Sequence, residues 1–155
     1  YFAELNGLNT EAILREALQI HSAIEIVDDT GRGFPLFEYL FALPLLLTKH
    51  FQEALYYTDH AIRYYSVGYQ NMDKEYFKTL ELVHAIALMK CGSRKEAETV
   101  YNNLRPSQFY FLNRKFNTIL YLILGNFFNK RSKKTEEQLE ELINDTGFVR
   151  LKSIR

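Results

Sequence analysis

The chain has 155 residues, of which 47% are apolar, and its 19 lysines and arginines balance 19 aspartates and glutamates. A chain of this length folds as one domain of ordinary size that buries roughly 70% of its unfolded surface, so it needs no disulfide or metal to be stable. Its single cysteine excludes an internal disulfide framework, and the absence of a basic excess argues against direct nucleic-acid binding.

The first residues carry no targeting signal. The chain opens at Tyr1 without a methionine, a basic region or a small-residue cleavage site, which predicts that no signal peptide is present and that an upstream part of a longer protein is missing. The apolar runs 36–47 and 116–128 are too short to span a bilayer. We therefore expect a cytoplasmic protein that does not enter a membrane.

Helical spacing of apolar residues begins in the first segment and continues through the first half of the chain. We predict helices from Asn9 to Asp28, from Pro35 to about Lys49, and from Phe51 to Ser66 or Val67, ended by Gly68. Asn9 caps the first of these helices, and Pro35 suits the first turn of the second.

Four further helices are predicted in the second half. They run from Asp73 to Lys90, from a capping box at Ser93 and Glu96 to Pro106, from about Ser107 or Leu112 to Asn129, and from a capping box beginning at Thr135 to Gly147. No segment alternates like a strand bounded by hairpin turns. The fold is therefore predicted to be all-α, with about seven helices.

A repeat of about 42 residues runs through this order. Ala12, Ala54 and Ala97 are 42 and 43 residues apart, each follows a glutamate, and a further 42 residues lead to Leu139. A fixed period of this size is typical of arrays of helical hairpins, in which neighbours stack and share a core. The predicted hairpin units are 1–34, 35–72, 73–106 and 107–147.

At these positions the sequence resembles the tetratricopeptide-repeat family. The matching residues are Ala42, Phe51-Gln52-Glu53-Ala54-Leu55 and Ala61-Ile62 in one copy, and Ala85, Leu88, Gly92, Glu96-Ala97, Tyr101 and Leu104 in the next. The repeat of this chain is longer than that of the family, because extra residues such as Gly68 to Met72 lengthen its helices or the loops between repeats. The resemblance implies antiparallel hairpins stacked as a right-handed α-solenoid, with a concave groove that binds peptides and no chemistry of its own.

In such an array, one flank of the first helix of each pair lines the groove. The side chains expected there are Tyr39, Leu43, Leu46, Leu82, Ile86, Met89 and Lys90. They are nearly all apolar, which suits a helix or an extended peptide, and Lys90 would add a bond to a carboxylate. Alternatively, missing repeats or the chain's own termini cover this surface, because broad apolar patches are unusual on monomers.

The polar residues do not form a pattern typical of catalysis or metal binding. His84 and Cys91 are seven residues apart and so about 10 Å apart along a helix axis, too far to share one metal. Cys91 lies near a helix C-terminus, where the dipole disfavours a thiolate. We expect no metal, no cofactor and no catalytic residue.

The function predicted from the sequence is a non-enzymatic scaffold that binds a protein or peptide through an apolar concave groove. The alternative is the peptide-sensing C-terminal domain of a bacterial transcriptional regulator whose DNA-binding part precedes Tyr1. A helix-turn-helix ahead of Tyr1 would favour the alternative. Formation of a homo-oligomer is left open.

Overall fold

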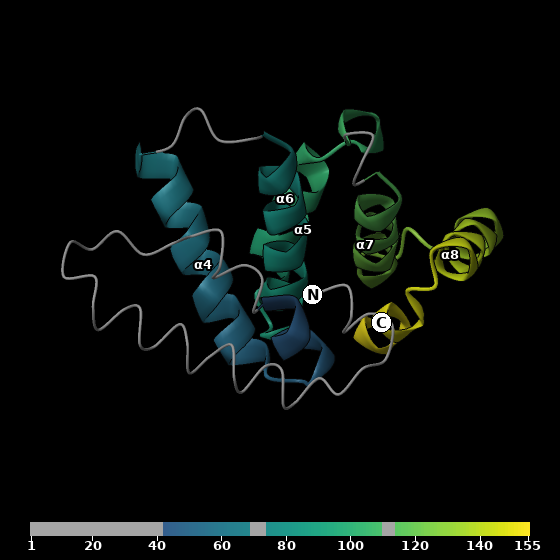
Figure 1. Ribbon diagram of the computed structural model, residues 1–155, viewed down its shortest axis with the longest axis horizontal. Coiled ribbons are helices and arrows are strands. Elements are labelled where there is room, and N and C mark those ends of the chain that lie inside the picture. Colours follow the sequence, from purple (N-terminus) through teal and green to yellow (C-terminus); the bar gives the residue numbers. More distant parts are fainter. Residues whose placement is uncertain (1–41, 69–73, 110–113) are drawn as a thin grey trace.

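The computed structural model describes residues 42–68, 74–109 and 114–155, and in these ranges the chain is helical without any strand (Figure 1). The elements after a helical segment at 42–47 are α4 (Phe51–Gly68), α5 (Lys74–Lys90), α6 (Arg94–Asn103), η1 (Pro106–Gln108), α7 (Arg114–Phe127), α8 (Lys133–Thr146) and η2 (Val149–Ile154). The all-α prediction is confirmed for this part. The predicted helix at 9–28, Ala12 and Tyr39 lie outside the described residues.

The same backbone turn ends the helical segment at 42–47, helix α5 and helix α7. Lys49, Gly92 and Asn129 adopt positive φ values of 65°, 88° and 58°. After Gly92, the amide of Ser93 donates to the carbonyl of Leu88 at 2.9 Å, and the amide of Gly92 donates to the carbonyl of Met89 at 3.2 Å. This pair of bonds is the Schellman arrangement, which satisfies carbonyls left over at a helix end.

The bonds after Lys49 and Asn129 repeat this arrangement. The amide of His50 donates to the carbonyl of Leu45, and that of Lys130 to the carbonyl of Gly125. Each turn leads directly into a second helix, which is α4, α6 or α8. Three helix pairs within the described residues are therefore built with the same kind of connection.

Helix α5 lies at the centre of the packing. It contacts α4, α6 and α7, and α7 in turn contacts α6, α8 and η1, while η2 packs on α8. Figure 1 shows the succession from α4 through α5 and α6 to α7 and α8. Ala54 and Ala97, near the starts of α4 and α6, are fully buried, as is Leu139 at the corresponding place in α8. Their burial agrees with the repeat seen in the sequence.

The two predicted capping boxes are corrected by the structure. Ser93 precedes α6 as its N-cap residue, but its side chain makes no capping hydrogen bond. Helix α8 begins two residues before the predicted cap, because Ser132 takes the extended N-cap conformation and accepts from the amide of Thr135 at 3.1 Å. The Thr135 hydroxyl accepts from the Ser132 amide at 2.8 Å. Gly147 ends α8 as predicted, with a φ of 74°.

Beyond Gly147 the structure adds η2, which the sequence analysis did not predict. Leu151 and Ile154 from this short helix are buried in the common core. On the surface, Lys152 and Arg155 both donate to the carboxylate of Glu140 on α8, at 2.7 and 2.9 Å. These contacts hold the last described residues against α8.

Candidate functional site

The residues predicted to line an apolar groove are mostly core residues. Leu43, Leu46, Leu82 and Ile86 are each at most 2% exposed and belong to one hydrophobic cluster with side chains of α7. The two residues of α5 among them, Leu82 and Ile86, lie on a helix that packs against α7 as well as against α4 and α6. Their predicted binding role stays a prediction, but in this structure they offer no surface to a partner.

Lys90 is held by the protein itself. Its Nζ lies 5.0 Å from the ring centroid of Phe127 on α7 and 5.7 Å from that of Phe51 on α4, and it donates to the carbonyl of Arg155 at 3.4 Å. Burial, together with the positive charge of Lys49, lowers the pKa of Lys90. The ammonium therefore joins α5 to α4 and α7 through two cation–π contacts, and to Arg155 through a hydrogen bond. Met89, beside it, is only partly buried.

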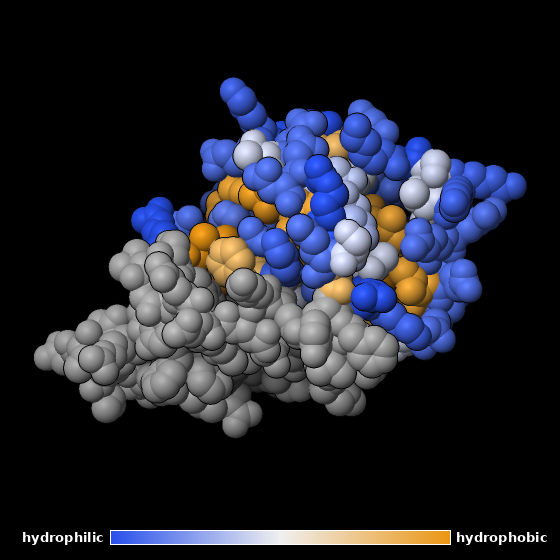
Figure 2. Space-filling view, turned by 90° about the horizontal axis from the view of Figure 1, so that it is seen from above, coloured by the Kyte–Doolittle hydropathy of each residue, from blue (hydrophilic) through white to orange (hydrophobic). Residues whose placement is uncertain are grey.

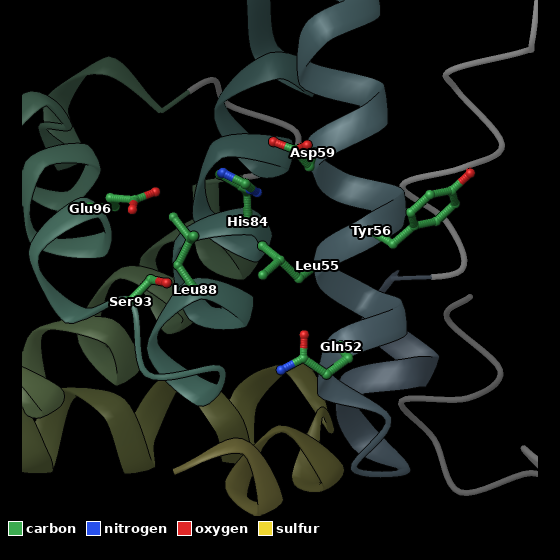
Figure 3. Close-up of a pocket in the computed structure, with 8 residues that line it drawn as sticks. All are labelled: Gln52, Leu55, Tyr56, Asp59, His84, Leu88, Ser93 and Glu96. Atoms are coloured by element: carbon green, nitrogen blue, oxygen red, sulfur yellow. The ribbon is translucent and has the colours of Figure 1, made fainter.

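A different surface forms a cleft, on the side of α5 where α4 and α6 flank it. We call it the α4–α6 cleft; its volume is about 340 Å³. The residues that line it are Gln52, Leu55, Tyr56, Asp59, His84, Leu88, Ser93 and Glu96 (Figure 3). This volume falls in the range of small-ligand sites, roughly 300–1,000 Å³.

His84 lies at the centre of the cleft, on α5 (Figure 3). Its Nδ1 is 2.9 Å from the hydroxyl oxygen of Thr58, a buried residue of α4. The Thr58 hydroxyl donates its only proton to the helix, with the carbonyl of Ala54 at 3.0 Å. When this proton goes to the carbonyl, the Thr58 oxygen accepts from Nδ1–H of His84, and in that tautomer the Nε2 of the neutral ring carries a lone pair.

Two carboxylates flank this imidazole. Figure 3 shows Asp59 on α4 and Glu96 on α6 at opposite sides of His84, each turned toward it. Burial lowers the pKa of His84, and the charges of Asp59 and Glu96 oppose this effect without overcoming it. The ring is therefore neutral at pH 7, and the cleft presents hydrogen-bond acceptors from three helices.

The remaining lining residues form the rest of the wall of the α4–α6 cleft. Leu55 and Leu88 supply apolar surface between the helices, and Gln52 and Ser93 lie at the end nearer the α5–α6 turn (Figure 3). Tyr56, which is 64% exposed, turns its ring away from His84 and lies parallel to the ring of His60, with centroids 6.2 Å apart. Asp59 also pairs with Arg63 at 2.7 Å on the outer side of α4.

Sequence reasoning missed this cleft because its residues come from three helices. Spacings of three or four connect the lining residues only within one segment at a time. These sets are Gln52, Leu55, Tyr56 and Asp59; His84 and Leu88; and Ser93 and Glu96. The available signal was the polar side chain of His84 within the otherwise apolar run of α5. That signal alone does not tell which helices cover the histidine.

The other described residues form no arrangement typical of a metal site or of a membrane span. The coloured part of the face seen in Figure 2 is mostly hydrophilic, with hydrophobic residues visible in smaller areas. Residues 42–68, 74–109 and 114–155 contain no group of three or more His, Cys, Asp or Glu side chains arranged to hold a metal. Burial raises the pKa of the Cys91 thiol. None of the helices in these ranges has the length and hydropathy of a bilayer span.

Comparisons of this chain with protein-family models, with curated proteins and with solved structures gave no significant match.

Proposed function

We propose that this chain is a non-enzymatic interaction domain, a tetratricopeptide-like array of helical hairpins that binds a segment of a protein or peptide. The repeated Schellman turns and the buried alanines at the start of α4 and α6 support an array of similar hairpins. Each hairpin in such an array contacts chiefly its neighbours, so clefts form between successive units.

The observation that carries the proposal is the α4–α6 cleft. It lies between the second helices of two successive pairs, and its volume of about 340 Å³ suits one or two side chains of a bound segment. Leu55 and Leu88 provide apolar contact, while Gln52, Asp59 and Glu96 provide polar groups that would fix the orientation of a ligand. Binding sites in general combine these two kinds of surface.

The hydroxyl–imidazole pair in the cleft favours binding over nucleophilic catalysis. A serine or threonine nucleophile must be accessible and must give its proton to a nearby base. Thr58 is fully buried, and the helix carbonyl of Ala54, 3.0 Å from its hydroxyl oxygen, competes with His84 for the hydroxyl proton. The pair therefore orients the imidazole and supplies no activated nucleophile.

A selection from a displayed library of short random peptides tests this proposal. The intact chain is the bait, and enriched peptides are titrated against it by fluorescence anisotropy. The test variant is Ser93→Tyr, which adds a neutral ring at the edge of the cleft and removes no capping bond. The matched control is Ser107→Tyr, the same change at an exposed position of η1 outside the cleft.

We expect enriched peptides to bind the original chain and Ser107→Tyr alike, and to lose at least about tenfold in affinity with Ser93→Tyr. Each variant's melting curve checks that it is folded. Failure to enrich any peptide, or equal binding to both variants, would show that the cleft is not a peptide site.

A further inference from the structure

The cleft combines acceptor groups in a way that points to one class of ligand. Asp59 and Glu96 face the imidazole from opposite helices, and the Nε2 of His84 has no hydrogen-bond partner within the described residues. In the tautomer whose Nδ1–H donates to Thr58, this Nε2 is an acceptor. Glu96 forms no ion pair within those residues, whereas Asp59 uses one carboxylate oxygen, Oδ2, for Arg63. The imidazole and two carboxylates, of which only that of Asp59 is paired with a cation in the described part of the chain, therefore border one cavity.

We infer that the α4–α6 cleft takes the ammonium or guanidinium group at the end of a lysine or arginine side chain of the bound segment. This inference rests on the proposed function, because it names the chemistry of the ligand at the same site. An ammonium carries three donors and no acceptor, and a guanidinium carries five donors. Either group matches a cavity that offers acceptors, and its charge complements the two carboxylates.

The apolar residues of the cleft fit the same ligand. The methylene stem of a lysine or arginine packs along apolar surface while its charged end remains among polar groups. Leu55 and Leu88 lie between His84 and the α5–α6 turn, so they offer such a surface beside the acceptors (Figure 3). An acidic side chain would meet like charges, and an aliphatic one would desolvate the carboxylate of Glu96 without giving it a partner.

The test uses the enriched peptides in three synthetic versions. Each lysine or arginine is kept, replaced by leucine, or replaced by glutamate, and binding to the intact chain is measured by fluorescence anisotropy. The protein variant is Glu96→Gln, which removes a charge and keeps the size of an exposed side chain. Its matched control is Glu137→Gln, an equally conservative change on α8, where Glu137 pairs with Lys133 at 3.8 Å.

We expect one basic residue in each peptide whose replacement by leucine weakens binding about tenfold or more, and whose replacement by glutamate weakens it further. Glu96→Gln should weaken binding of the basic peptide by about the same factor but leave its leucine version unchanged, and Glu137→Gln should change neither.

If Ser93→Tyr weakens peptide binding, but neither Glu96→Gln nor the replacement of any basic residue of the peptide does, this inference is overturned and the proposed function stands. Failure of every peptide to bind would overturn both.

Discussion

The hydroxyl oxygen of Tyr101 lies 3.0 Å from the position that a Cβ atom on Gly125 would occupy. Tyr101 belongs to α6 and Gly125 to α7, so the missing side chain lets the tyrosine ring fit between the two helices. The ring cannot easily move away, because it stacks on Tyr121 with centroids 4.6 Å apart and lies 5.3 Å from Phe128.

Gly125→Ala should therefore destabilise the protein, although alanine is the better helix former. Alanine gains about 1 kcal/mol over glycine in a helix interior, whereas overpacking a tight core costs typically about 1–3 kcal/mol. We expect a net loss of free energy of unfolding, measured by urea titration. Tyr101→Phe removes the hydroxyl that the new methyl group would meet, so Gly125→Ala should be less harmful in that background. An identical cost in both backgrounds would show that the hydroxyl is not the obstacle.

The two serines that precede helices should respond differently to truncation. Ser132→Ala removes a side-chain bond to the amide of Thr135 and should cost about 1 kcal/mol of stability. Ser93→Ala removes no capping bond and should change stability by less than about 0.5 kcal/mol. Thermal and urea unfolding of both variants measure the difference. Equal costs would mean that Ser93 caps α6 in solution, as the sequence pattern predicted.

A charge introduced on the buried face of α5 should prevent stable folding. Ile86 is fully buried, so Ile86→Glu places a carboxylate in the core at a cost of several kcal/mol, at least about 3. Val149, which is 56% exposed, provides the matched control: Val149→Glu should change stability by about 0.5 kcal/mol at most. A cooperatively folded Ile86→Glu protein with native stability would indicate that this face is exposed, as a groove would be.

As the pH is lowered, the protein should lose stability in the range where His84 of the unfolded chain takes up a proton. Its ordinary pKa is 6.5, and burial lowers the pKa in the folded protein despite the nearby Asp59 and Glu96. Above pH 6.5 the ring is neutral in both states and has no effect. As the pH falls from 6.5 through the folded pKa, the unfolded state binds the proton more readily, so stability is lost. Chemical denaturation of the original chain and of His84→Gln at several pH values measures this loss.

The glutamine variant should lose less stability between neutral and mildly acidic pH, because the other titrating groups are common to both proteins. Parallel pH profiles would mean that the pKa of His84 is the same in the folded and unfolded states.

Local features of this chain could be predicted because they depend on neighbours in the sequence. Gly92 and Gly147 mark helix ends since glycine adopts positive φ without a steric penalty, and both take that conformation. The apolar period likewise predicted a helix from about Ser107 or Leu112 to Asn129, and the observed α7, Arg114–Phe127, lies inside that range. The start of α8 was misplaced because Ser132 and Thr135 are both good N-cap residues, and the backbone conformation decides between them.

The sequence by itself determined that the described chain is helical, approximately where its helices end, and that alanines such as Ala54 and Ala97 belong inside. Only the tertiary structure decided that α7 covers the α5 face carrying Ile86, and that Asp59 and Glu96 meet around His84. The physical reason is that helix formation and capping act over a few residues, whereas the faces of one helix are covered or left open by segments far away in the chain.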